Sequence, residues 1–236
     1  DLFGMNAAGT DAKMRNTKES ILEAQFTSGA GNWCTWMFGR DLVNWNNNFT
    51  WAKWVTPSRD LISAFKQEGD EVRFKESIVY YDCNWSNYYP SDNYPFMYKC
   101  RSANSSIIKY RYADVLLLKA EALIMQDTPD LEGAADIIDK VRDRAKLGAL
   151  PTSVRSNKNV LLNALLKERR LELAFEGQRW FDLVRLDKVE EVMNAVYSKD
   201  SGRKAQIYTF DKNSYRLPIP QSVIDANDKI HQNPGY

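Results

Sequence analysis

The spacing of apolar residues predicts two adjacent helices in the middle of the chain. Residues 112–125 are apolar on nearly every side of a helix, which is typical of a central, buried helix. The next helix is predicted over residues 131–147, and its apolar positions recur at helical spacing: Ala134, Ile137, Ile138, Val141 and Ala145. The polar break at residues 127–130 joins the two as an antiparallel hairpin of about 34–37 residues, close to the length of a tetratricopeptide (TPR) repeat.

Further helical patterns follow this hairpin. They cover residues 157–176, which end at Gly177, and then residues 179–186 and 188–197. A single hairpin cannot bury both of its faces, so repeats of this kind need neighbours. The sequence therefore predicts a mainly α fold, built on TPR-like helical hairpins with a loop-rich, irregular remainder.

The pattern before the helices is irregular. A short helix is predicted over residues 59–66 with Ser58 as its N-cap, residues 75–81 read as a strand, and residues 18–26 fit either a strand or a short helix. We therefore expect three regions. The first is a loop-rich aromatic region over residues 1–104, and we expect it to bind ligand. The second is a TPR-like helical region over 105–200, and the third is an extended tail over 201–236 that packs on the helices. We expect the three to form one domain.

Charge and cysteine usage narrow the possible functions. The 32 basic and 31 acidic residues leave a net charge of +1, so the basic excess that nucleic-acid binding needs is absent. No apolar run in the sequence approaches the length of a membrane span. The sequence has no CxxC pair and a single histidine, His231, so we expect no metal site and no cofactor. At most one disulfide can form among Cys34, Cys83 and Cys100, and buried free thiols are the simpler reading.

The region 30–54 offers the best candidate binding residues. Indole rings can stack on the apolar C–H face of a sugar, and neighbouring amides can both donate to and accept from its hydroxyls. The candidates for ligand contact are Trp33, Trp36, Asn44, Trp45, Asn46 and Asn47, with Trp85, Tyr88, Tyr89 and Tyr94 as a second group. The alternative is that these aromatic residues pack the loops onto the helices, and we expect this of Trp51 and Trp54.

A run of acidic residues near Gly177 allows two interpretations. Glu168, Glu172 and Glu176 recur every four residues, on one helix face. Two of them could serve as the acid and nucleophile of a glycoside hydrolase. We favour a structural network instead, because like charges at this spacing need cations. The predicted members of that network are Arg169, Glu172, Glu176, Arg179, Asp182 and Arg185.

Three motifs resemble one protein family in their order and spacing. The first is RYADVLL at residues 111–117 with KAEA at 119–122, the second is ERRLELAFEGQRWFDLVR at 168–185, and the third is LPIPQ at 217–221 with QNPGY at 232–236. The chain resembles the C-terminal half of SusD/RagB proteins. The family's N-terminal half, with its signal peptide and lipidated cysteine, has no counterpart in this sequence.

The resemblance implies a surface-exposed lipoprotein of the outer membrane of Bacteroidetes. Such proteins bind oligosaccharides, or in some members peptides or glycoprotein glycans, and deliver them to a SusC-like TonB-dependent transporter for nutrient uptake. The resemblance implies no catalysis. We therefore expect three partners: an oligosaccharide, the transporter, and the N-terminal half of the same protein. The alternatives are a TPR-type protein-interaction module without sugar binding and the glycoside hydrolase.

Overall fold

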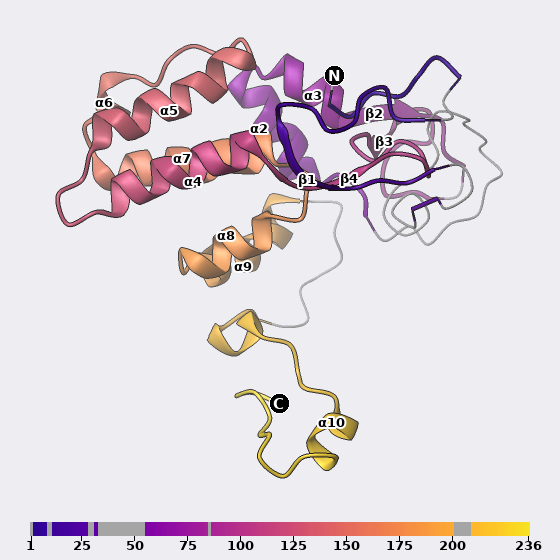
Figure 1. Ribbon diagram of the computed structural model, residues 1–236, viewed down its shortest axis with the longest axis vertical. Coiled ribbons are helices and arrows are strands. Elements are labelled where there is room, and N and C mark those ends of the chain that lie inside the picture. Colours follow the sequence, from indigo (N-terminus) through magenta and orange to yellow (C-terminus); the bar gives the residue numbers. More distant parts are fainter. Residues whose placement is uncertain (1, 9–10, 28–30, 33–54, 85, 201–208) are drawn as a thin grey trace. The chain divides into compact units, whose positions relative to one another are not determined.

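The structure, a computed structural model, describes residues 2–8, 11–27, 31–32, 55–84, 86–200 and 209–236. Within it the chain forms two compact units, Asp1–Arg179 and Trp180–Tyr236, which are described separately here (Figure 1). From composition we expected boundaries near residues 104 and 200 instead. Those boundaries, and the packing of the tail on the helices, stay predictions. The mainly α architecture predicted from the sequence is confirmed.

The predicted helical hairpin is present in the first unit. Helix α4 spans Tyr112–Met125, as predicted, and α5 spans Leu131–Arg144. The Asp130 side chain caps α5 by accepting a hydrogen bond of 2.9 Å from the Gly133 backbone N–H. The helix ends three residues earlier than its apolar pattern indicated, because Lys146 has a positive φ of 60° that no helix accommodates.

Two more helices complete this layer. The short α6 (Thr152–Arg155) leads into α7 (Lys158–Glu172), which packs against both α4 and α5. The prediction that α7 would run to residue 176 was wrong. The backbone turns left-handed at Phe175, with a φ of 64°, and again at Gly177, with a φ of 82°. The chain therefore leaves the helix axis just before the last of the three glutamates.

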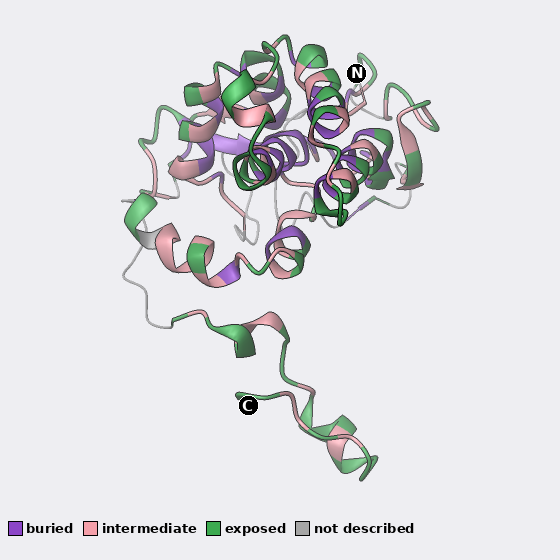
Figure 2. Ribbon diagram, turned by 90° about the vertical axis from the view of Figure 1, so that its left-hand side faces the viewer, coloured by how far each residue is buried: buried purple, intermediate pink, exposed green. Residues whose placement is uncertain are grey.

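The core of the first unit lies between α4, α5 and α7. Buried apolar side chains from the three helices meet there, and the smaller ones let the helices approach closely. The buried members are Leu117, Ala120, Ile124, Ala134, Ala135, Ile137, Ile138, Val141, Leu161 and Leu165. Figure 2 shows the buried positions gathered on the inward sides of these helices.

The part that precedes the hairpin mixes short helices and strands. Helix α2 (Arg59–Glu68) begins at the predicted cap, where the Ser58 hydroxyl accepts a hydrogen bond of 3.1 Å from the Leu61 backbone N–H. Helix α3 (Glu71–Ser77) follows at once, because the Asp70 side chain caps it. The strand predicted over 75–81 was therefore wrong in its first half, where the chain is still helical.

Two antiparallel strand pairs hold this part together. Strand β1 (Ser20–Ala24) pairs with β4 (Ile107–Arg111), which runs directly into α4. Strand β2 (Ile78–Tyr81) pairs with β3 (Tyr94–Met97), with Ile78 opposite Met97 and Tyr81 opposite Tyr94. The second pair forms a hairpin, and the loop between its strands carries the site described below.

The second unit is smaller. It contains α8 (Arg179–Arg185), which begins at the last residue of the first unit, followed by α9 (Val189–Lys199), a 3₁₀ turn at Lys212–Tyr215 and α10 (Gln221–Asp225). The Asn194 side chain exchanges two hydrogen bonds of 2.8 and 2.9 Å with the backbone of Phe210, so the chain returns to α9. No helix among the described residues is long and apolar enough to cross a membrane.

Helix α4 presents apolar side chains on the side that faces away from its neighbours. Its buried residues lie towards α5 and α7, whereas the opposite side exposes a run spaced three or four residues apart: Tyr112, Val115, Leu118, Ala122 and Met125. The helix is apolar on nearly every side and has few helices around it, so we expected part of its apolar surface to stay open, and this side is exposed. An exposed apolar stripe of this kind is typical of a surface that associates with something else.

We expect this stripe to make the 236-residue chain bind a hydrophobic dye and self-associate, unless further polypeptide covers it. Dye fluorescence and light scattering would measure both effects. The double substitution Val115→Ser and Leu118→Ser should lower both signals, because it removes apolar area from the centre of the stripe. Lys119→Ser, on the same exposed side of α4, is the matched control and should change neither. A strictly monomeric chain that binds no dye would contradict the prediction.

Candidate functional site

Most of the predicted ligand-contacting residues fall outside the described part of the chain. These residues are four tryptophans and three asparagines: Trp33, Trp36, Trp45, Trp85, Asn44, Asn46 and Asn47. Trp51 and Trp54, expected in the core, lie outside it as well. These assignments stay predictions. Tyr88 is described, and the structure places it in a pocket on the β2–β3 loop.

The β2–β3 loop, residues 82–93, is closed at its base by backbone hydrogen bonds. The Cys83 N–H donates to the Ser91 carbonyl oxygen at 2.6 Å, and the Asn93 N–H donates to the Pro90 carbonyl oxygen at 3.2 Å. The first bond joins the two sides of the loop beyond the Tyr81–Tyr94 pair, and the second closes a turn over residues 90–93. The described residues 84 and 86–90 therefore form one projection between Cys83 and Ser91.

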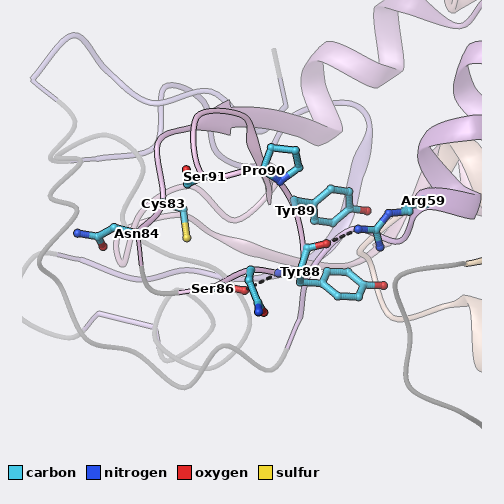
Figure 3. Close-up of a pocket in the computed structure, with 9 residues that line it drawn as sticks. Arg59, Cys83, Asn84, Ser86, Tyr88, Tyr89, Pro90 and Ser91 are labelled. Atoms are coloured by element: carbon cyan, nitrogen blue, oxygen red, sulfur yellow. Dashed lines mark hydrogen bonds between the residues drawn. The ribbon is translucent and has the colours of Figure 1, made fainter.

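This projection and the start of α2 enclose an open pocket of about 800 Å³. The pocket is lined by Arg59, Cys83, Asn84, Ser86, Asn87, Tyr88, Tyr89, Pro90 and Ser91. In Figure 3, Asn84 and Arg59 stand at opposite ends of this group. The lining combines aromatic rings, amides and hydroxyls in a space large enough for a small ligand.

The tyrosines of the pocket belong to an aromatic cluster. The rings of Tyr88 and Tyr89 meet edge to face, with centroids 5.0 Å apart, and Tyr89 makes a similar contact with Tyr94 at 5.6 Å. The Tyr89 hydroxyl donates to the Pro57 carbonyl oxygen at 2.7 Å, which ties the loop to the segment before α2. Tyr94 is buried, whereas Tyr88 and Tyr89 are half-buried. The cluster thus anchors the loop through Tyr89 and Tyr94.

Arg59 packs against the two half-buried rings. Its guanidinium carbon lies 4.5 Å from the ring centroid of Tyr88 and 4.2 Å from that of Tyr89, within the range of cation–π attraction. An Arg59 Nη2 N–H also donates to the Tyr88 carbonyl oxygen (Figure 3). These contacts fix the guanidinium in one place at the edge of the pocket.

Sequence reasoning placed Tyr88 and Tyr89 in its second group of candidates and missed Arg59. The cluster of Trp85, Tyr88, Tyr89 and Tyr94 was visible as a composition signal. Arg59, however, lies 29 residues before Tyr88 and joins the pocket only through the fold. No local pattern marks such a residue.

The three glutamates form a second group of charged residues, which is buried. Arg111 joins two of them: its Nη1 donates to Glu172 Oε1 and its Nε donates to Glu176 Oε2, each at 2.6 Å. Arg73 Nη1 donates to Glu168 Oε1 at 2.5 Å, and Lys99 Nζ donates to Glu176 Oε1 at 2.6 Å. All three carboxylates therefore face cations in the interior of the first unit.

Most of these cations come from segments that the sequence analysis did not connect with the glutamates. It named Arg169, Arg179 and Arg185 as their neighbours. The structure shows Arg169 Nη2 bonded to Asp114 Oδ1 at 2.8 Å, and Arg185 Nη2 bonded to Asp182 Oδ1 at 2.9 Å. Arg179 Nη1 donates to the Leu166 carbonyl oxygen at 3.2 Å. Residues beside a glutamate on the helix point elsewhere, because each successive side chain turns by about 100°.

The electrostatics of Glu172 do not suit proton transfer. Burial alone would raise the pKa of its carboxyl group, but Arg111, Arg144, Lys99 and Arg73 outweigh burial and hold the pKa at about 2. A general acid works best with a pKa near the operating pH. The geometry of Glu172 is that of a fixed anion that joins α7 to β4, and this is what a structural role requires.

The chain is similar to known proteins over most of its length. A model of the SusD family matches residues 92–236. Two relatives from Formosa agariphila match as well: SusD-like protein P38 is 43% identical over 99 residues, which is 39% of this chain, and SusD-like protein P2 is 36% identical over 143 residues, which is 58% of it. The matched stretches span 19% and 27% of the length of these two curated relatives.

A solved structure extends the similarity to nearly the whole fold. A laminarin-binding SusD-like protein superposes on 94% of this chain with a TM-score of 0.63 and 25% identity, and the chain covers 51% of that protein. All of the pocket residues, Arg59 included, lie before the residues that the family model matches.

Proposed function

Because this chain belongs to the SusD family, we propose that it binds an oligosaccharide in the pocket on the β2–β3 loop. The observation that carries the proposal is the pocket's lining. Two half-buried tyrosines, Tyr88 and Tyr89, line a space of about 800 Å³ together with the amides of Asn84 and Asn87.

The chemistry of this lining matches that of a sugar. A pyranose ring has an apolar C–H face that packs on an aromatic ring, and its burial there supplies the binding energy. Its hydroxyls both donate and accept, as do the side-chain amides of asparagine. Tyr88 suits the stacking role better than Tyr89, because the Tyr89 hydroxyl is bonded to Pro57 within the protein.

The relatives support a glycan as the ligand. One solved protein that this chain resembles over 94% of its length is a laminarin-binding SusD-like protein. Trp33, Trp36, Trp45 and Trp85, together with the amides of residues 44, 46 and 47, remain part of this proposal as further ligand contacts.

The remaining parts of the proposal concern the whole protein. In this proposal the whole protein is a surface lipoprotein of the outer membrane that delivers its oligosaccharide to a SusC-like TonB-dependent transporter. The whole protein performs no catalysis. The support is membership of the SusD family, together with the Glu172 carboxylate, which is held as a buried anion rather than as a proton donor.

We expect Tyr88→Ala to weaken oligosaccharide binding about tenfold, from a parent affinity in the micromolar to millimolar range. The reason is the loss of one stacking ring. Titration calorimetry with laminarihexaose, followed by a panel of other oligosaccharides, would measure it. Tyr110→Ala is the matched control, since Tyr110 is an exposed tyrosine on β4, and it should bind like the parent.

The same titration on Trp45→Ala, Trp36→Ala and Trp33→Ala decides which of the two candidate regions binds the oligosaccharide. If Tyr88→Ala binds like the parent while a tryptophan variant loses affinity, the ligand sits on residues 30–54 and the pocket assignment is wrong. If no oligosaccharide binds the parent at all, the proposed function fails.

A further inference from the structure

We infer that the β2–β3 pocket selects acidic oligosaccharides, those that carry carboxylate or sulfate groups, over neutral ones, and that Arg59 makes the selection. This inference rests on the proposed function and deepens it. Arg59 is the one charged side chain among the nine described residues that line the pocket, and none of the nine is acidic. The described part of the lining therefore has a net positive charge.

The position of Arg59 strengthens the positive potential. Arg59 is the first residue of α2, and the N-terminus of a helix carries a partial positive charge from its backbone dipoles. A cation gains nothing from that end of a helix, so its placement there has no helix-stabilising reason. The next residue, Asp60, is engaged by Arg170, whose Nη2 lies 2.5 Å from Asp60 Oδ2. Part of the negative charge nearest to Arg59 in sequence is thus already offset.

The contacts of Arg59 also hold its guanidinium in a defined orientation. The rings of Tyr88 and Tyr89 lie 4.5 and 4.2 Å away, and the Tyr88 carbonyl oxygen accepts one of its N–H groups. A guanidinium fixed in this way loses little further freedom on binding, and its planar fork of donors fits the paired oxygens of a carboxylate or a sulfate. The guanidinium lies over the Tyr88 ring, so a sugar that contacts this tyrosine would bring a charged substituent to Arg59 at the edge of the ring (Figure 3).

Two acidic residues flank the pocket and oppose this attraction. Asp82 precedes Cys83 and Asp92 follows Ser91, and both side chains are exposed. Exposed charges are screened by solvent and salt, so their effect is weaker than that of Arg59 beside the rings. They also provide a second test, because removing them should favour an acidic ligand without touching the pocket lining.

The experiment compares three probes by titration calorimetry on the 236-residue chain. Laminarihexaose is neutral, an oligogalacturonate carries carboxylates, and a carrageenan oligosaccharide carries sulfates. The parent should bind at least one acidic probe about tenfold more tightly than laminarihexaose at low ionic strength, and added salt should reduce this difference. Comparison of the two acidic probes shows whether the pocket prefers carboxylate or sulfate groups.

Arg59→Gln should remove the preference, so that the acidic probe and laminarihexaose bind this variant with affinities within about twofold of each other, because Gln keeps a planar amide but no charge. Arg59→Lys should keep part of it. Lys75→Gln, which removes one exposed positive charge on α3, is the matched control and should keep all of it. If Arg59→Gln fails to fold, the double variant Asp82→Asn and Asp92→Asn serves instead and should tighten binding of the acidic probe.

The outcomes separate the inference from the proposed function. A parent that binds laminarihexaose as tightly as both acidic probes overturns the inference and leaves the proposed function standing. An acidic preference that survives in Arg59→Gln also overturns it, and Arg59 is then only a clamp for the tyrosines. If no probe binds the parent, both fall together.

Discussion

Replacing Glu172 with alanine should lower the free energy of unfolding by roughly 3–5 kcal/mol, the usual cost of removing one partner from a buried ion pair. Glu172 is 2% exposed, and its carboxylate contacts the side chains of Arg73, Arg111 and Arg144. Arg111 is also 2% exposed, so the substitution leaves a guanidinium in the interior with fewer bonds. Urea denaturation of the parent and variant would measure the loss.

The matched control for this substitution is Glu71→Ala on α3. Glu71 pairs with Lys75, but both side chains are largely exposed, and exposed pairs contribute about 1 kcal/mol or less. Equal losses for the two variants would contradict the structural role of Glu172. A folded, stable Glu172→Ala protein that no longer binds oligosaccharide would contradict it too, because it would place Glu172 in the ligand site.

Acid should destabilise the protein through the same residue, by about 3 kcal/mol between pH 5 and pH 2. The cations around Glu172 lower the pKa of its carboxyl group from an ordinary value of 4.5 to about 2 in the folded state. As the pH falls through this window, the unfolded chain takes up the proton first, so protonation favours unfolding. The stabilisation is complete above about pH 5 and is lost as the pH approaches 2.

The measurement is the urea midpoint as a function of pH. The parent should show a steep fall below pH 5, and Glu172→Gln should show a shallower one from a lower starting stability, because its side chain cannot take up a proton in this range. Parallel profiles for the two proteins would show that acid acts through other groups.

Local chemistry made the helices predictable. The range of α4 could be read from its sequence because an apolar run ends at a polar break, and the start of α2 could be read from the Ser58 cap. The end of α7 could not, because a left-handed backbone at Phe175 is uncommon for a residue other than glycine, and the sequence gives no sign of it. The strand at 75–81 failed similarly, since the Asp70 cap starts a helix that the alternating pattern hid.

The sites depend on contacts between distant segments. Arg73 and Glu168 are 95 residues apart, and Arg111 and Glu172 are 61 apart. A pattern within one helix shows that the glutamates need cations, but it does not show which ones the fold will supply. Only the tyrosines of the pocket could be predicted for the same reason, because they cluster in sequence whereas Arg59 comes from another element.

The buried bonds of Arg111 also decide which parts of the protein can open independently. Arg111 connects the end of β4 to Glu172 and Glu176 and also reaches Glu19, so strand, helix end and N-terminal segment are held by one residue. Local opening of any of these would break several charge-assisted bonds at once, which makes them a single cooperative unit that opens as a whole. The described loop residues 83–84 and 86–91 take no part in these bonds and are held instead by Tyr89 and Arg59, so opening of the loop would leave the Arg111 bonds intact.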